Sequence, residues 1–114
     1  MKLIICNAFS LNMLNGDAFE AVMCQCSPKQ LKREISVANK IESYVGHQTT
    51  ADIFSNILGV EIPMNRGTLK INTGEEYHIL VGQYTGPRLE EGAKELPVGA
   101  KIVWWIVEIK TFSL

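Results

Sequence analysis

Hydrophobic positions along the chain predict a protein rich in β-strands. The apolar run at residues 3–6 has the length of a short buried strand, and residues 19–26 alternate weakly, as a second strand would. Residues 102–107 are apolar at every position, which is typical of an interior strand covered on both faces. Trp104 and Trp105 are adjacent there, so we expect them on opposite sides of the sheet, one in the core and the other in the core or a subunit interface.

Turn residues separate the remaining predicted strands. Residues 41–45 come after the first predicted helix and are expected to form a short strand or extended segment. Strands at 68–71 and 76–84 are separated by Asn72-Thr73-Gly74, which predicts a hairpin turn. A loop rich in glycine and proline at 85–100 leads to the last strand at 101–110.

Two helices are predicted between the strands. Ser27-Pro28 is a cap followed by a favoured first residue, so a helix is expected over 29–38 with Asn39 as its stop. A second helix is expected over 49–58, because its apolar residues recur at helical spacing. Its expected end groups are Thr49 and Thr50 as caps, Asp52 as negative charge in the first turn, and Gly59 just past the last turn.

Strands outnumber helices, and the connections mix hairpins with crossovers. We therefore expect an α/β (α+β) fold, in which a mixed, mostly five-stranded β-sheet is flanked by α-helices. The 114 residues predict a single domain over 1–114, large enough to bury a substantial core.

Composition narrows the class of protein. A net charge of −1 argues against a protein that coats long DNA or RNA, yet it allows a small anionic ligand held by a few arginines. Cys6, Cys24 and Cys26 are expected to be small core hydrophobes in a reducing cytosol. No apolar run has the length of a membrane span, and the N-terminal run is too short for a signal peptide.

Familiar catalytic motifs are missing from the sequence. It has no phosphate-binding loop, no dinucleotide fingerprint, no zinc-protease motif and no nucleophile elbow. His47 and His78 are the only histidines, and the cysteines lack metal-ligand spacing, so we expect neither a metal site nor a cofactor. His78 lies in a predicted strand, where a position on a face or an edge is expected.

His47 is the strongest candidate for chemistry. It directly precedes the helix at 49–58, where free N–H groups and the helix dipole attract anions. A histidine beside an anion site suggests proton transfer to or from a phosphate ester. The alternative is a loop histidine that only packs.

Two arginines and a group of short polar residues are further candidates. Arg66 and Arg88 each lie in a loop beside glycine or proline, and guanidinium groups bind phosphate with paired hydrogen bonds. Glu91 could orient Arg88; an exposed loop salt bridge is the alternative. Asn7, Ser10 and Asn12 follow the first strand, either as turn and cap residues or as ligand contacts at the carboxyl end of a strand, and Ser10 could cap a helical turn.

Four blocks of the chain, taken in order, resemble the viral and prophage anti-CRISPR ring nucleases. The blocks are residues 7–14, Gly46-His47 with Thr49-Thr50, Asn65-Arg66, and residues 88–92. Residues 83–87 and Trp104-Trp105 look like the bacterial and phage branch of that family. Gln48 and Thr49 depart from the archaeal viral pattern, in which acidic and serine residues are common. Members of the family degrade cyclic tetra-adenylate, the second messenger of type III CRISPR defence.

The resemblance implies a metal-independent ring nuclease that works as a homodimer, with cyclic tetra-adenylate in a cleft across the two-fold axis. It implies linear di-adenylate products with 2′,3′-cyclic phosphate ends, and action in the cytoplasm of the host cell. His47 is the implied general acid, Arg88 the implied stabiliser of transition-state charge, and Glu91 the residue that holds Arg88. The implied ligand contacts are Asn7, Ser10, Asn12, Thr49, Arg66 and Gln83.

Two other classes of function remain open from the sequence. One is a binding module that sequesters a cyclic nucleotide without cutting it. The other is an interaction protein that blocks a host enzyme through its tryptophan-bearing face. Chromatography of the products distinguishes the first from a nuclease, and a pull-down without nucleotide supports the second.

Overall fold

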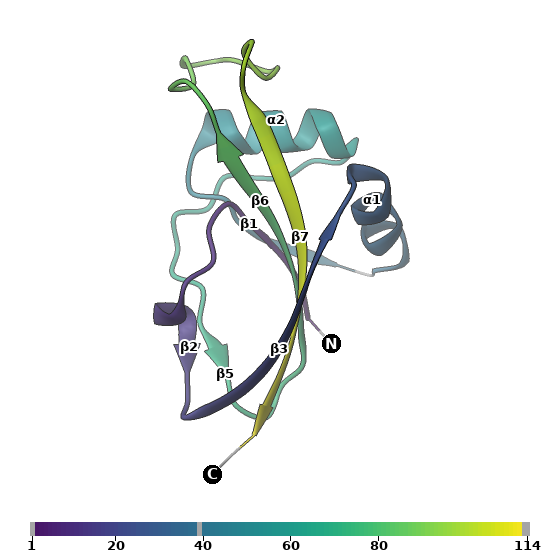
Figure 1. Cartoon of the computed structure of the whole chain (residues 1–114), viewed down its shortest axis with the longest axis vertical. Helices are drawn as coiled ribbons and strands as arrows, with labels where there is room; N and C mark the ends of the chain where they lie inside the picture. The colour runs from purple at the N-terminus through teal and green to yellow at the C-terminus, as the bar shows by residue number, and fades with distance from the viewer. Residues whose placement is uncertain (1, 39, 113–114) are drawn as a thin grey trace.

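The computed structural model describes residues 2–38 and 40–112, which form a five-stranded mixed sheet in the order β3-β7-β6-β1-β4 (Figure 1). Strands β1 (Lys2–Cys6), β4 (Ile41–Tyr44) and β6 (Tyr77–Thr85) are parallel to one another. Strand β7 (Lys101–Phe112) runs antiparallel to both β6 and β3 (Ala18–Cys26). The predicted mixed five-stranded α+β fold is therefore confirmed.

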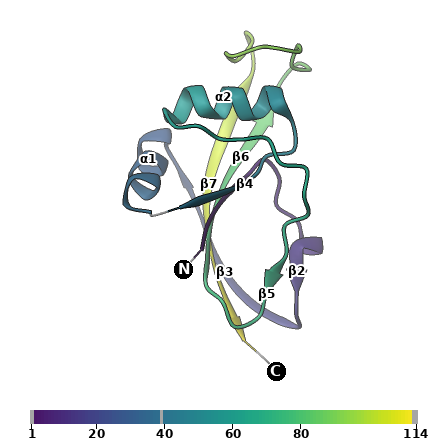
Figure 2. The same cartoon turned by 180° about the vertical axis from the view of Figure 1, so that it is seen from behind.

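Both helices lie on one face of the sheet (Figures 1 and 2). Helix α1 (Pro28–Val37) and helix α2 (Gln48–Leu58) bury their apolar sides against β1, β6 and β7. The cluster between the helices and the sheet includes Leu3, Ile5, Leu31, Ala51, Phe54, Leu58, Leu80 and Trp104. As predicted, Trp105 lies on the other side of β7, packed against a second cluster.

A small second sheet covers part of the opposite face. Strands β2 (Leu14–Asn15) and β5 (Ile71–Asn72) pair in parallel, and Ile71 is fully buried in the second core cluster. The predicted hairpin between 68–71 and 76–84 is therefore wrong. The pairing edges of β6 are taken by β1 and β7, while the apolar side chain of Ile71 is buried in the cluster on the opposite face.

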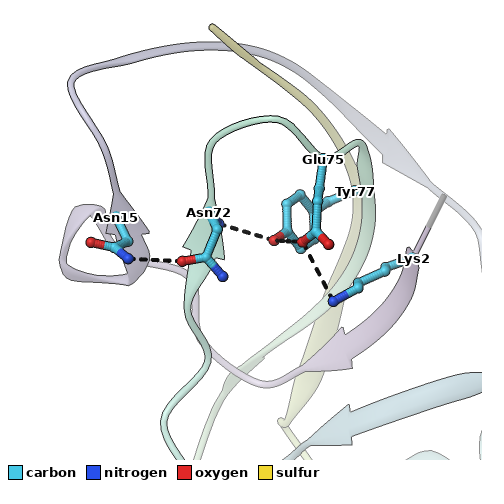
Figure 3. A network of polar contacts seen from close by, with 5 residues as sticks. All are labelled: Lys2, Asn15, Asn72, Glu75 and Tyr77. Carbon is cyan, nitrogen blue, oxygen red and sulfur yellow. Dashed lines mark hydrogen bonds and ion pairs between the residues drawn. The ribbon is translucent and has the colours of Figure 1, made fainter. Parts of the chain in front are cut away.

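A chain of polar contacts ties the small sheet to the start of the large one (Figure 3). Asn15 Nδ2 donates to Asn72 Oδ1 at 2.8 Å, and the backbone N–H of Asn72 donates to the Tyr77 hydroxyl at 2.9 Å. That hydroxyl donates to Glu75 at 2.7 Å, and Glu75 also pairs with Lys2 at 3.4 Å. The hydrogen bond from Tyr77 lowers the pKa of Glu75, which keeps the carboxylate charged for both partners.

The predicted start of α1 is confirmed, and the predicted ends of α2 are partly wrong. The side chains of Ser27 and Gln30 each accept a hydrogen bond from the other residue's backbone N–H, forming a capping box that begins α1; Asn39 lies outside the described residues. Thr49 and Thr50 do not cap α2, because extended backbone at His47 makes it the N-cap and places both threonines in the first turn. Gly59 ends the helix with φ of 70°, as predicted.

Two smaller predicted end groups also differ from the structure. Asp52 lies beyond the first turn of α2, where it accepts a hydrogen bond from Gln48 Nε2 at 2.8 Å. Ser10 is the N-cap of a 3-10 turn at Leu11–Met13, but its side chain makes no capping hydrogen bond there.

The cysteines divide by burial. Cys6 is a core residue as predicted, and burial raises the pKa of its thiol to about 12. Cys26 is partly buried against the helix-side cluster, whereas Cys24 is exposed, so the prediction of a core role is wrong for Cys24. Its strand β3 is at the edge of the sheet, where only one side is paired. Within the described residues, no helix is long and apolar enough to span a membrane.

Candidate functional site

The carboxyl ends of the three parallel strands gather the polar candidates at one edge of the sheet. In the register, Cys6 of β1 lies beside Tyr44 of β4 and Val81 of β6. Asn7 directly follows β1, and Gly46-His47 follows β4 at the start of α2. The loop from β6 to β7 starts at the same edge (Figure 1). Ligands of open α/β sheets bind at such an edge.

One cavity at this edge brings three of the predicted residues together. It has a volume of about 370 Å³ and contains His47 and Thr49 from the start of α2, and Arg88 from the β6–β7 loop. Its lining is completed by Thr50, Tyr84 and Leu89. An imidazole, a hydroxyl and a guanidinium therefore share one cavity with the N-terminus of α2, an arrangement suited to a phosphate group.

Helix α2 is held close to the sheet, which fixes where its N-terminus lies. The rings of Phe54 and Trp104 have centroids 4.7 Å apart and are inclined at 56°. Gly82 of β6 lies under both rings, and a Cβ atom there would come within 2.5 Å of Phe54 and 2.6 Å of Trp104. The glycine is therefore required for this close approach. Sequence reasoning missed it, because a glycine inside a strand pattern gives no sign of what packs on it.

The loop that carries Arg88 is attached at both ends. The hydroxyl of Tyr84 donates to the backbone carbonyl of Pro87, and Asn56 Nδ2 of α2 donates to the carbonyl of Lys94 at 3.2 Å. Gly86 adopts φ of 151°, and a Cβ atom there would lie 2.7 Å from Ala100. Tyr84 and Asn56 thus support Arg88, and neither was predicted, because each looks like an ordinary strand or helix residue.

The backbone ahead of His47 is hydrogen-bonded on both sides. Asn7 Oδ1 accepts from the N–H of Gly46 at 3.3 Å, and Arg66 Nε donates to the carbonyl of Gly46 at 3.2 Å. The structure thus brings Asn7 and Arg66 to the predicted site, where both side chains form hydrogen bonds with the backbone of Gly46.

A second cavity opens on the face without helices. It has a volume of about 360 Å³ and is lined by Asn7, Ala8, Phe9, Met23, Val81, Gln83, Trp105 and Val107. Most of this lining is apolar, with the amides of Asn7 and Gln83 in it. Gln83 and Tyr84 alternate along β6, so Gln83 belongs to this cavity and Tyr84 to the one with His47.

Besides Arg66, three predicted residues line neither cavity. Ser10 and Asn12 are exposed around the 3-10 turn, and the Asn12 carbonyl accepts a hydrogen bond from Lys70 at 3.5 Å. Glu91 is exposed, and no ion pair between it and Arg88 occurs in the described part of the chain; Glu90 instead lines a small cavity of about 200 Å³ with Arg88. The roles of all three residues stay predictions.

The second histidine lies away from this edge. His78 lies on the helix-covered face of β6, one of the two positions predicted for it. Its Nδ1 lies 3.8 Å from Glu34 Oε2, and its Nε2 lies 3.8 Å from Glu108 Oε1. Across residues 2–38 and 40–112, no group of three or more His, Cys, Asp or Glu side chains is arranged to hold a metal ion.

The fold and the site define an α+β protein with a polar cavity where parallel strands end. More specifically, the chain belongs to the STIV B116-like family, whose model matches residues 3–97. It is 31% identical over 117 residues to uncharacterized protein 26 of Sulfolobus islandicus filamentous virus (isolate Iceland/Hveragerdi), an alignment that covers 97% of this chain and 94% of the relative. Its fold is similar to that of B116 of Sulfolobus turreted icosahedral virus, with a TM-score of 0.73, 24% identity, and coverage of 94% and 98% of the two chains.

Proposed function

We propose that the protein is a ring nuclease that cleaves cyclic tetra-adenylate to linear di-adenylate and so switches off type III CRISPR signalling. The observation that carries the proposal is the cavity shared by His47, Thr49 and Arg88 at the N-terminus of α2. It supplies a proton donor and a cation beside an anion-binding helix end, which are the groups that phosphodiester cleavage requires.

The proposed reaction is an internal transesterification. The 2′-oxygen of a ribose forms a bond to the neighbouring phosphorus and gives up its proton to solvent, while the bond from phosphorus to the 5′-oxygen breaks. His47 donates a proton to the departing 5′-oxygen. Arg88 stabilises the charge that builds on the phosphoryl oxygens. The products carry 2′,3′-cyclic phosphate and 5′-hydroxyl ends, so no water is consumed, and in the proposed mechanism His47 and Arg88 act without a metal ion.

We further propose that a homodimer performs this reaction in the cytoplasm of the host cell. A ring of four nucleotides is large compared with the 370 Å³ cavity of one chain, and a two-fold dimer offers two His47 residues to opposite bonds. The apolar cavity lined by Phe9, Met23 and Trp105 supplies a surface for the second copy on the sheet face that carries no helix.

Incubation with a panel of cyclic oligonucleotides in EDTA tests the proposal. Cyclic tetra-adenylate should be cut to di-adenylates under chelation. Cleavage that is lost in EDTA and restored by Mg²⁺ or Mn²⁺ contradicts the metal-free mechanism. Tight binding of uncut nucleotide would instead identify a sequestering protein. If the protein neither binds nor cuts the nucleotide, the proposal is overturned.

A further inference from the structure

Gly46, the residue directly before the proposed acid His47, has both of its backbone polar groups bound by side chains. Its N–H donates to Asn7 Oδ1 at 3.3 Å, and its carbonyl accepts from Arg66 Nε at 3.2 Å. The two side chains come from distant parts of the sequence and meet on the two sides of one residue. Both were predicted to contact ligand.

Gly46 lies between two residues whose carbonyls are bound by backbone N–H groups: Val45 accepts from Asn65 at 2.8 Å, and His47 accepts from Ala51 at 2.9 Å. Glycine has the widest conformational freedom of any residue, and no atom lies within 4 Å of the Cβ position of Gly46. The following N-cap, His47, makes no capping hydrogen bond with its own side chain. The two bonds to Gly46 therefore restrain the residue through which the chain enters α2, and with it the position of the His47 imidazole.

Arg66 itself extends from a segment tied firmly to β4. The backbone N–H of Asn65 donates to the Val45 carbonyl at 2.8 Å, and Asn65 Nδ2 donates to the Ser43 carbonyl at 2.9 Å. Asn65 Oδ1 accepts from the N–H of Gly67 at 2.8 Å, which closes the turn around Arg66. The guanidinium is thus held by a braced loop, as a positioning group requires.

We propose that Asn7 and Arg66 are positioning residues that act through Gly46 on His47. This inference rests on the proposed nuclease function and assigns the two residues a different role from ligand contact. Because both bonds are made to the backbone beside His47, losing them disturbs the geometry of proton donation more than it weakens binding. A misplacement of about 1 Å can lower a rate about 100-fold.

The decisive experiment separates the rate of cleavage from affinity. Single-turnover cleavage of saturating cyclic tetra-adenylate is measured for Asn7→Leu and Arg66→Ala, and the Kd is measured for the same changes in a His47→Ala background that does not cut. We expect each rate to fall about 10- to 100-fold while each Kd changes less than about threefold. A Kd that rises as much as the rate falls overturns the proposal and makes the residue a ligand contact.

Conservative and control variants sharpen the result. Asn7→Asp keeps an oxygen that accepts from Gly46, so it should recover most of the rate lost in Asn7→Leu; if Asp is as slow as Leu, Asn7 does not act as an acceptor. Arg33→Ala removes a cation from the exposed surface of α1 and should leave both rate and Kd unchanged. If Arg33→Ala lowers the cleavage rate as much as Arg66→Ala does, the effect of Arg66 comes from its positive charge alone and not from its bond to Gly46.

A measurement without nucleotide keeps this inference separate from the proposed function. Amide hydrogen exchange of Gly46, followed by NMR, should be slow in the wild-type protein and at least tenfold faster in Asn7→Leu. An unprotected Gly46 amide in the wild type overturns the positioning role whatever the enzyme assays show. If the protein neither binds nor cuts the nucleotide but its Gly46 amide is protected, the proposed function is wrong and the two hydrogen bonds to Gly46 still stand.

Discussion

The two faces of the sheet are covered to different degrees. On one face, α1 and α2 seal a cluster in which Phe54 rests on Trp104 and Gly82 with no room for another carbon atom. On the other face, two strands of two residues each cover only part of the sheet, and the cavity beside Phe9 and Trp105 stays open. In the proposed nuclease, the sealed face would position His47 and Arg88, and the open face would bind the second copy of the chain.

Replacing the proposed acid is the severest test of this division. His47→Ala should lower cleavage of cyclic tetra-adenylate about 10²- to 10⁴-fold, the usual contribution of general acid catalysis. Binding should persist, because Arg88 and the N-terminus of α2 remain. Quenched single-turnover assays and titration with labelled ligand measure the two effects.

Two results would contradict that expectation. Wild-type cleavage by His47→Ala would show that the acid lies elsewhere. Failure of the variant to bind would make His47 a ligand contact. His78→Ala is the matched control, because it removes the other histidine, which lies away from the strand ends between Glu34 and Glu108.

The sequence predicted well those parts of the fold that local signals determine. Ser27-Pro28 marks a helix start by neighbouring residues alone; the structure confirms that start and adds a capping box with Gln30. The turn signal at Asn72-Thr73-Gly74 was equally local, but it cannot say which strand is the partner. That choice depends on Ile71 packing across the opposite face and on β1 and β7 already occupying both edges of β6.

The close packing of Phe54 and Trp104 on the helix-covered face can be tested by adding one methyl group at Gly82. Gly82→Ala places a Cβ within 2.5 Å of the buried ring of Phe54, so the rings must shift and α2 with them. Overpacking of this kind costs about 1–3 kcal/mol. Urea unfolding should show this loss, with a smaller loss of cleavage as His47 moves. Gly46→Ala is the control for stability, because no atom lies within 4 Å of its Cβ position. Equal stability of the two variants would show that α2 is not tightly seated.

The open face is tested by placing a charge on it. Met23 lines the apolar cavity and is 52% exposed, so Met23→Glu should cost the single chain little. A buried glutamate at a dimer interface should weaken association at least tenfold, or about 1.4 kcal/mol. Sedimentation across a concentration series measures this. Val37→Glu on α1, where the side chain is 82% exposed, is the control and should change nothing. A monomeric wild type, or unchanged association of Met23→Glu, removes this face as the dimer interface.

The candidate site was predictable only where chemistry and chain position coincide. His47, Thr49 and Arg88 carry the polar groups that a phosphate ligand needs, and the parallel strands bring them to one cavity. Asn56 and Gly82 support that cavity without lining it, through the loop after Arg88 and the packing of α2, and Tyr84 lines it while its hydroxyl binds the Pro87 carbonyl. Such support depends on long-range packing, which no local pattern encodes. Thr49 also shows how one extended residue ahead of a helix moves the cap from the threonine to His47.

The smallest effect should come from α1, which shares the sealed face with α2 but lines neither the cavity around His47 nor the cavity on the open face. Ser27→Ala removes the oxygen that accepts from the Gln30 N–H at 3.3 Å, and loss of an N-cap side chain costs about 1 kcal/mol. The free energy of unfolding should fall by that amount, while the cleavage rate stays within about twofold of wild type, because the bonds that seat His47 and Arg88 come from other elements. Ser27→Asp, which keeps an acceptor at the cap, should restore the stability. If Ser27→Ala slows cleavage as much as Gly82→Ala does, the sealed face acts as one unit, and α2 alone does not position the site.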